Sequence, residues 1–314
     1  MMLLWKQYLT MRYKPANDTA NLRTERPNPV SADLDIKSPL EIVEIINRED
    51  QRVAKAVKKV LPQIAEAIAL VESALRRGGR LIYVGTGTSG RIGALDASEC
   101  PPTFNTRPEQ VQYLIAGGEQ ALANAVEASE DSREVGQADM AKRKPGKKDV
   151  VIGLAASGRT PYTIAAMEYA RRKGSKTVAI VCNPESPLAD AADVAIEVEV
   201  GPEVVSGSTR MKAGTAQKMI CNMITTGALT RLGYVYGNLM VNLHLKNQKL
   251  VERGIRIVQQ VTGLSADDAI RLIESADESL PIALVMNEAG VSKTEATKRL
   301  KKAGGSVRKA IAGR

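Results

Sequence analysis

Aromatic side chains are scarce in this sequence of 314 residues, which contains eight tyrosines but only one tryptophan and one phenylalanine. Proteins that bind single-stranded nucleic acid stack its bases on exposed aromatic side chains. The scarcity argues against such a platform and predicts an aliphatic core. The net charge of +9 is not accompanied by a groove-reading motif, so we interpret it as a solvated basic face and expect no nucleic-acid partner.

Cysteine and histidine are also few. Cys100, Cys182 and Cys221 lie in separate segments without a C-x-x-C spacing, and His244 is the only histidine. This pattern argues against a disulfide framework and a structural zinc site, and we expect neither a metal nor another cofactor. No apolar run approaches the length of a membrane span, and the N-terminus lacks the apolar core of a signal peptide. We therefore expect a cytoplasmic protein without a membrane partner.

Composition and periodicity divide the chain into four parts. Residues 1–39 are polar and rich in proline and asparagine, which predicts an irregular arm. Residues 40–70 begin a pattern of apolar residues at spacings of three and four, which is typical of a helix or helix pair, and the pattern ends at Gly78 and Gly79. We assign 71–234 to one domain, which contains the loops described below, and 235–314 to a C-terminal helical domain.

The period changes after residue 80. Short apolar runs at 81–85, 111–118, 149–157, 176–182 and 194–200 predict strands, and helical patterns at 119–142 and 161–173 lie between them. Continuous apolar strands that alternate with helices predict an α/β fold, with a parallel sheet covered by helices on both faces in three layers. A long helix should follow, ending near residue 232. Short helices, broken at Gly263, Pro281, Gly290 and Gly304, should make up the chain beyond residue 250.

Two loops rich in small and hydroxyl residues follow predicted strands. They are GTGTSGR at 85–91 and AASGRTPY at 155–162, and both contain the tripeptide S-G-R. Such loops let a backbone approach a phosphate closely, and the next helix adds unpaired N–H groups. A third cluster of serine, threonine, glycine and lysine covers 201–218. The residues that we predict to bind a sugar phosphate are Thr88, Ser89, Ser157, Gly158, Arg159, Thr160 and Lys212.

The first loop also matches the dinucleotide fingerprint G-x-G-x-x-G as GTGTSG, at 85–90. A nicotinamide enzyme would place an acidic residue at the end of the second strand, about 20 residues further on. The second strand ends in AGG at 116–118 instead. The fingerprint is therefore weak evidence, and we reject a nicotinamide cofactor.

Longer motifs carry a family resemblance. The segments are LIYVGTGTSGRIGALDASECPPTF, GLAASGRTPY, CNP, GPEVVSGSTRMKAGTAQK and GNLMVNLHLKNQKL. Together they resemble the N-acetylmuramic acid 6-phosphate etherase family, in the sugar isomerase (SIS) superfamily, over residues 22 to 312. The resemblance implies a homodimer with a C-terminal segment like a ubiquitin-associated domain. It also implies a carbon–oxygen lyase of peptidoglycan recycling, which releases D-lactate and N-acetylglucosamine 6-phosphate.

The resemblance also points to two catalytic glutamates. It assigns one to Glu99, in DASECPP, and the other to Glu130, in SEDSRE. By their local sequence alone, both fit ordinary surface residues. We expect Glu99 near the C-terminal end of the helix that follows the first loop. We assign Glu99 as the acid that protonates the lactyl oxygen and Glu130 as the base that takes the C2 proton, and these roles are exchangeable.

Two other functions remain open from the sequence. An aldose–ketose isomerase would use the same fold and the same C2 proton without releasing lactate. A non-catalytic sugar-phosphate sensor would regulate a kinase or carry a DNA-binding head. The residues before the sheet lack a convincing helix-turn-helix unit, and the chain contains a single sugar-binding repeat, which argues against both kinds of sensor.

Overall fold

A computed structural model of the chain describes residues 22–124, 126 and 129–313. The first 21 residues of the predicted arm therefore lie outside the described residues. The rest of the arm, before the first long helix, contains two 3-10 turns, η2 (Pro29–Ser31) and η3 (Leu34–Ile36). No helix in the described part of the chain is long and apolar enough to cross a membrane.

Five parallel strands form one sheet in the order β2-β1-β3-β4-β5. Their bounds are β1 (Leu81–Gly85), β2 (Val111–Ile115), β3 (Val150–Leu154), β4 (Lys176–Val181) and β5 (Val194–Glu197). In the register, Leu81 of β1 lies opposite Val111 on one side and Val150 on the other. The predicted parallel sheet is confirmed. Each strand begins within one residue of its predicted start, and all but β1 end before the predicted end.

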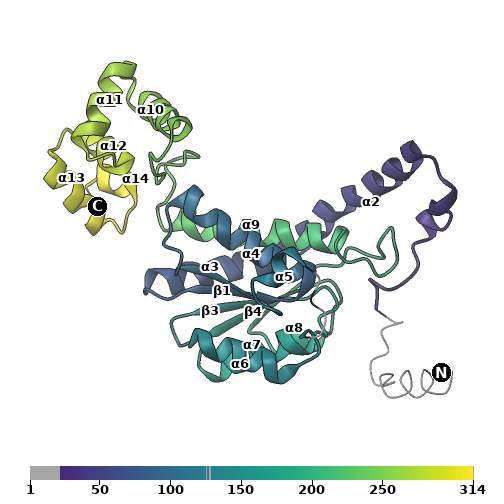
Figure 1. The fold of residues 1–314 in the computed structure, drawn as a ribbon. Helices are drawn as coiled ribbons and strands as arrows, with labels where there is room; N and C mark the ends of the chain where they lie inside the picture. Colours follow the sequence, from purple (N-terminus) through teal and green to yellow (C-terminus); the bar gives the residue numbers. More distant parts are fainter. Residues whose placement is uncertain (1–21, 125, 127–128, 314) are drawn as a thin grey trace, which may run out of the picture.

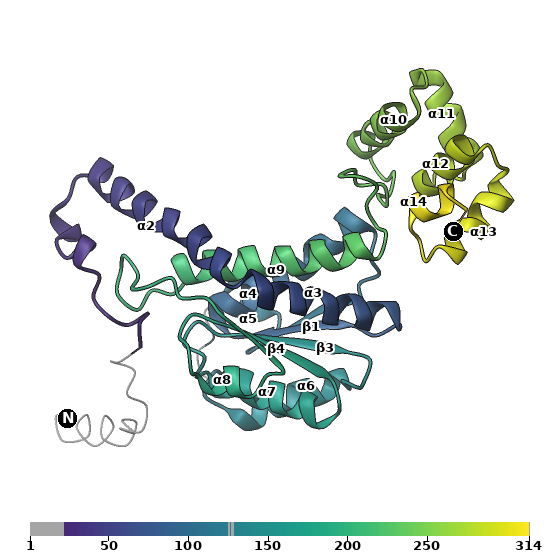
Figure 2. The same ribbon diagram turned by 180° about the vertical axis from the view of Figure 1, so that it is seen from behind.

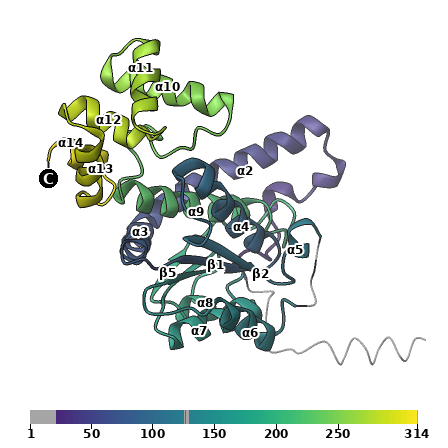
Figure 3. The ribbon, with the colours of Figure 1, turned by 60° about the vertical axis from the view of Figure 1, so that its left-hand side comes forward.

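Helices cover both faces of the sheet, as Figures 1 and 3 show. One face packs on α3 (Leu61–Arg76), α4 (Gly87–Phe104) and α9 (Lys212–Arg231), and the other on α6 (Arg133–Arg143), α7 (Pro161–Arg172) and α8 (Pro187–Asp190). Successive side chains of a strand point to opposite faces, so Tyr83 joins one core and its neighbour Val84 the other. This burial on both sides explains why the strands are continuously apolar.

Helix α2 (Pro39–Lys59) lies against the sheet layers only through its C-terminal half, and its N-terminal half projects from the molecule (Figures 1 and 2). Ser38 begins the helix with a capping box, in which its hydroxyl and backbone pair with Glu41. Leu40 and Val43, in the projecting half, are 66% and 55% exposed. The proposed domain boundary after residue 70 falls inside helix α3, which is a single helix packed on α9.

The C-terminal helices form a separate group with a core of their own (Figure 1). They are α10 (Gln248–Thr262), α11 (Ala266–Ser275), α12 (Leu280–Ala289), α13 (Lys293–Lys302) and α14 (Val307–Ile311). Gly263 and Gly290 end α10 and α12 in the left-handed conformation, as expected of helix C-caps. Pro281 stands in the first turn of α12, where a proline favours the start of a helix.

The helix predicted over 119–142 is wrong in its first half. The only helix in this half is a single turn, α5 (Gln120–Ala123), among the described residues; 124, 126 and 129–132 are not helical, and α6 begins at Arg133. Ser132 starts α6, because its hydroxyl accepts a hydrogen bond from the Val135 N–H over 3.2 Å. Glu130 therefore lies in irregular chain before a helix, and not on a charged helix face.

Candidate active site

The two S-G-R loops lie side by side, because they follow the neighbouring strands β1 and β3 at the same edge of the sheet. Their local structures differ. Ser89 and Arg91 belong to the first turns of α4, whereas Ser157 and Arg159 precede α7, which begins at Pro161. The sequence predicted both positions correctly at the carboxyl edge of the sheet, where ligands bind in such folds.

The first loop is held by contacts within the protein. The Ser89 hydroxyl donates to Oε1 of Gln217 on α9 over 2.9 Å. The Arg91 guanidinium donates to three backbone carbonyls that lead toward Glu130, at residues 121, 122 and 124. Gly87 adopts a φ of +47°, which an L-residue with a side chain rarely adopts. The first loop therefore ties the segment before Glu130 to helix α4.

The second loop leaves more of its polar atoms unpaired. Ser157 Oγ accepts a hydrogen bond from the Arg159 N–H over 3.2 Å, and its hydroxyl proton has no acceptor among the described residues. Gly158 adopts a φ of +68°, and a Cβ there would lie 2.1 Å from Ser186 Oγ. Thr160 precedes α7 without a capping hydrogen bond from its side chain. These features suit a loop whose donors face a ligand.

Glu130 connects the two loops. A Cβ built on Gly87 would lie 3.4 Å from Oε1 of Glu130, so this carboxylate lies against the start of α4. Its backbone carbonyl accepts a hydrogen bond from the Tyr162 N–H, in the first turn of α7, over 3.1 Å. The carboxylate therefore lies close to the first loop, while its backbone is fixed by the second.

Glu99 is exposed on α4 and lies near the C-terminal end of this helix, as expected. The helix continues through Pro101 and Pro102 to Phe104, and the Asn105 N–H still bonds the Pro101 carbonyl. Glu99 follows Gly87 by twelve residues, which corresponds to about 18 Å along a helix. The two predicted glutamates therefore lie at different ends of α4 within one chain.

Asp96, three residues before Glu99, is a buried carboxylate that the sequence reasoning missed. It accepts hydrogen bonds from Tyr83 on β1 and from Asn222 and Thr225 on α9, over 2.8, 2.6 and 3.2 Å. Burial raises the pKa of Asp96 above its ordinary value, and these hydrogen bonds oppose that rise. The carboxylate fixes α4 against the sheet and α9, which orients the helix that carries Glu99.

Lys212, predicted as a substrate ligand, is fully buried at the start of α9. Its ammonium group lies 2.5 Å from Oε2 of Glu49 on α2, and Asn28 donates to the same oxygen over 3.0 Å. Burial opposes ionisation of Glu49, but the hydrogen bonds from Lys212 and Asn28 outweigh it and lower the pKa of this carboxyl. In this arrangement Lys212 connects α9 to α2.

The segment after residue 21 crosses the same edge of the sheet, and the sequence reasoning gave it no role. Asn183, in the CNP motif, donates to the Thr24 hydroxyl and to the Ala156 carbonyl of the second loop, both over 3.0 Å. Its side-chain oxygen accepts from the Arg23 N–H over 2.8 Å. The Gly207 N–H bonds the Thr24 carbonyl over 3.2 Å. The sequence indicated a role for this segment only through the family resemblance, which begins at residue 22 with LRTERPNP.

Buried polar atoms without hydrogen-bond partners gather around these loops. Among the described residues they are Arg159 Nε, Thr163 Oγ1, Ser186 Oγ, Gln217 Nε2 and, elsewhere, Thr106 Oγ1. Folded proteins normally satisfy such groups. Four of these five atoms belong to, or contact, the two loops and their helices, which marks this edge as a place for a polar ligand.

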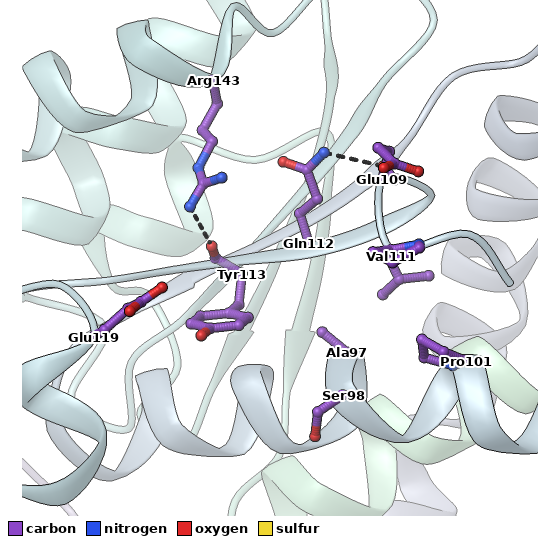
Figure 4. Close-up of a pocket in the computed structure, with 10 residues that line it drawn as sticks. Ala97, Ser98, Pro101, Glu109, Val111, Gln112, Tyr113, Glu119 and Arg143 are labelled. Carbon is purple, nitrogen blue, oxygen red and sulfur yellow. Dashed lines mark hydrogen bonds between the residues drawn. The ribbon is translucent and has the colours of Figure 1, made fainter.

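A hollow of about 400 Å³ beside the edge strand β2 contains none of the predicted binding residues (Figure 4). It includes Ser98, the neighbour of Glu99, and its other lining residues are Ala97, Pro101, Pro108, Glu109, Val111, Gln112, Tyr113, Glu119 and Arg143. Arg143 donates to the Tyr113 carbonyl over 3.1 Å, which pairs one outward-facing acceptor of the edge strand. The loops and their unpartnered donors, rather than this hollow, define the candidate site.

The described residues contain few side chains suited to metal binding or to thiol chemistry. The described residues contain no group of three or more histidine, cysteine, aspartate or glutamate side chains that could hold a metal ion. Cys100, the neighbour of Glu99, is buried, and its burial raises the pKa of the thiol to about 12. A thiol with that pKa stays protonated near neutral pH and packs as a small apolar group.

Three family models match the chain. The N-terminal SIS domain of glucokinase regulatory protein matches residues 63–171, and the SIS domain matches residues 128–227. The HYPK UBA domain matches residues 282–312, which contain α13 and α14 and most of α12. The expected ubiquitin-associated-like segment at the C-terminus is confirmed.

Curated relatives match nearly the whole chain. The N-acetylmuramic acid 6-phosphate etherase of Photorhabdus laumondii is 51% identical over 291 residues, which cover 93% of this chain and 97% of the relative. The enzyme of that name from Klebsiella aerogenes is 51% identical, with 94% and 98% covered. That of Symbiobacterium thermophilum is 57% identical, with 86% and 90% covered.

Proposed function

The chain belongs to the N-acetylmuramic acid 6-phosphate etherase family, and on that premise we propose that it cleaves the D-lactyl ether of N-acetylmuramic acid 6-phosphate. The products are N-acetylglucosamine 6-phosphate and D-lactate. One observation carries the proposal within this chain. The Glu130 carboxylate lies at the first S-G-R loop, while its backbone is bonded to the helix that follows the second. A sugar phosphate held by these loops lies beside a carboxylate.

The reaction is an elimination followed by hydration. A base takes the C2 proton, which the C1 aldehyde of the open-chain sugar makes acidic. The electron pair forms a C2–C3 double bond while the C3–O bond breaks, and an acid protonates the departing lactyl oxygen. Water then adds its hydroxyl to C3 and its proton to C2. General acid–base help of this kind contributes about 10² to 10⁴ per group.

Glu130 acts as the C2 base and Glu99 as the acid for the lactyl oxygen. The serine and threonine hydroxyls and the Arg159 guanidinium bind the phosphate, together with the helix N-termini that follow each loop. A phosphate-binding role for Arg159 is supported by its Nε, which is buried without a hydrogen-bond partner in the described structure. The buried ion pair with Glu49 gives Lys212 a different task, which is to hold the loop that precedes α9.

The protein acts as a homodimer whose site takes Glu99 from the second copy. C2 and C3 are bonded neighbours, so their acid and base must lie close together. About 18 Å of helix separate Gly87, beside Glu130, from Glu99 of the same chain. Leu95, one turn before Glu99, is 48% exposed, and an exposed apolar residue beside a catalytic one suits a subunit interface.

The cytoplasm is the compartment that we infer for this reaction. Cys100, Cys182 and Cys221 are free and buried. Such thiols suit a reducing compartment, in which disulfides are rare.

Release of D-lactate from N-acetylmuramic acid 6-phosphate by purified protein tests the function. We expect Glu99→Gln and Glu130→Gln each to reduce kcat by at least about a hundredfold, with the affinity for N-acetylglucosamine 6-phosphate retained. Absence of lactate with folded wild-type protein would refute the etherase function. Full activity in either variant would refute the role of that residue.

Mixing the two inactive variants tests the shared site. After subunit exchange, half of the dimers carry one chain of each variant, and one of their two sites contains both natural glutamates. About a quarter of the wild-type activity should return. If Glu99 and Glu130 of the same chain formed each site, mixing would restore nothing.

A further inference from the structure

Gln217 is a buried side chain in contact with the predicted phosphate site, and the mechanism above does not use it. It lies on α9 and is 1% exposed. Its Oε1 accepts the proton of Ser89, while its Nε2 is buried and has no hydrogen-bond partner among the described residues. A buried amide N–H without a hydrogen-bond partner destabilises the folded state, so such groups are rare in folded proteins.

The Gln217 side-chain amide lies next to the start of α4, where it contacts Ser89. Ser89 is the third residue of this helix, whose first N–H groups have no partner within the helix. Helix α9 runs alongside, since a Cβ on Gly214 would lie 3.5 Å from Thr88 Cγ2. Gln217 follows Gly214 by one turn and reaches the same end of α4. Ser89 therefore lies at the N-terminus of the long helix α4 and beside Nε2 of Gln217, a buried donor without a partner among the described residues.

The hydrogen bond between Ser89 and Gln217 decides what Ser89 can bind. A serine hydroxyl has one proton, and an ionised phosphate only accepts hydrogen bonds. While Ser89 donates to Oε1 of Gln217, its proton is not available to a phosphate. If the amide turns by half a rotation, Nε2 donates to Ser89 Oγ instead, and the serine proton becomes free. The amide oxygen and nitrogen are nearly equal in shape, so both orientations fit the same space.

We propose that Gln217 is a positioning residue that converts Ser89 into a donor when a phosphomonoester binds. In the bound state, Nε2 of Gln217 donates to Ser89 Oγ, and Ser89 donates to a phosphate oxygen. The chain of hydrogen bonds ends on a charged acceptor, which strengthens each member. The proposal rests on the sugar-phosphate substrate of the proposed function, and it adds the residue through which Ser89 recognises that phosphate.

Two variants of Gln217 separate this role from simple packing. Gln217→Met keeps the length of the side chain and removes the donor, and we expect it to weaken binding of N-acetylglucosamine 6-phosphate about threefold, the same loss as for Ser89→Ala. Gln217→Glu forces Ser89 to keep donating toward α9 and adds a negative charge, so the loss should reach about a hundredfold. N-acetylglucosamine without the phosphate should bind all three proteins equally. Thr215→Ala, at an exposed position of the same helix, is the control and should change neither affinity.

A double-mutant cycle tests whether Gln217 acts through Ser89. In a Ser89→Ala background, Gln217→Met should have no further effect on binding of the phosphorylated sugar, measured by calorimetry. An equal loss in both backgrounds, or an equal loss for the sugar without phosphate, would overturn the proposal. Unchanged affinity in Gln217→Glu would also overturn it. Because binding is measured without turnover, a failure of the etherase function would show separately, as wild-type protein that binds the sugar phosphate but releases no lactate.

Discussion

The first and second loops contain the same tripeptide and make different contacts with it. In the first loop, Ser89 and Arg91 lie within α4 and bond to protein atoms, namely Gln217 and the carbonyls of residues 121, 122 and 124. In the second, Ser157 and Arg159 precede α7, and Arg159 keeps a buried Nε without a partner in the described structure. The arginine of the tripeptide therefore holds neighbouring backbone in the first loop, whereas in the second loop its Nε has no partner among the described residues.

The position of the helix start explains the difference. An arginine in the second turn of a helix points sideways from it, and Arg91 meets the chain that passes beside α4. An arginine before the helix lies at its open end, where the backbone N–H groups also point, and Arg159 is in that position. A short repeat in a sequence therefore does not imply a repeated function unless the helix begins at the same place in both copies.

Removing Arg159 should have the largest effect among changes that compare the loops. In Arg159→Met, the substrate loses a charged donor, and KM for N-acetylmuramic acid 6-phosphate should rise about 10- to 100-fold. Thermal stability should change little. Lactate release over a range of substrate concentrations measures KM, and an unchanged KM would place the phosphate elsewhere.

Removing Arg91 should damage catalysis rather than binding. In Arg91→Met, three backbone carbonyls lose their donor, and the segment that leads to Glu130 is released from α4. We expect kcat to fall about tenfold, with KM within about threefold of the wild type and a loss of stability of roughly 1 to 2 kcal/mol. Urea unfolding and initial rates measure both. If Arg91→Met instead raised KM as much as Arg159→Met, the two loops would be equivalent.

The two serines give a finer comparison. The Ser157 proton has no acceptor in the described part of the chain, so Ser157→Ala should raise KM about tenfold. The Ser89 proton becomes available only after the Gln217 amide turns, which uses part of the binding energy. Ser89→Ala should therefore raise KM by only about threefold. A larger effect at Ser89 would reverse the ranking of the loops.

Replacing Asp96 by asparagine should have the smallest effect, a change in the free energy of unfolding that depends on pH. Burial raises the pKa of this carboxyl in the folded state, so the folded chain binds the proton more tightly than the unfolded chain. The resulting stabilisation is complete below the ordinary aspartate pKa of 3.8, and it is lost as the pH rises through the folded pKa. The stability of the wild type relative to Asp96→Asn should therefore be higher at pH 4 than at pH 7. Urea unfolding at both values measures it, and the opposite trend would contradict the raised pKa.

The sheet and the loop positions could be predicted because they depend on local patterns. Apolar runs bounded by glycines identified all five strands, and the carboxyl edge of a parallel sheet then fixed where both loops lie. Pro101 and Pro102 lie inside α4, although a proline normally interrupts helix hydrogen bonds. Here α4 continues, and the packing of Cys100 and Phe104 in the core holds its last turns. Local propensity yields to such tertiary contacts.

The contacts around the site are mostly long-range and could not be read from the sequence. The partners of Ser89 and Lys212 lie 128 and 163 residues away along the chain. Nothing near Lys212 in the sequence marks it as the partner of Glu49. The assignment of Glu99 and Glu130 depended on the family resemblance, because neither residue stands out by its local sequence.

The segment at residues 22–31 has a consequence for how the protein is made. Arg23 bonds to Asn183, which is synthesised 160 residues later. At ribosomal rates of about 5 to 20 residues per second, the two residues are made roughly 8 to 32 seconds apart. Residues 22–31 must therefore stay without this contact until Asn183 and the edge of the sheet that carries it have been made. Deletion of residues 22–31 would therefore act on the second loop, because Asn183 bonds both Thr24 and the Ala156 carbonyl of that loop.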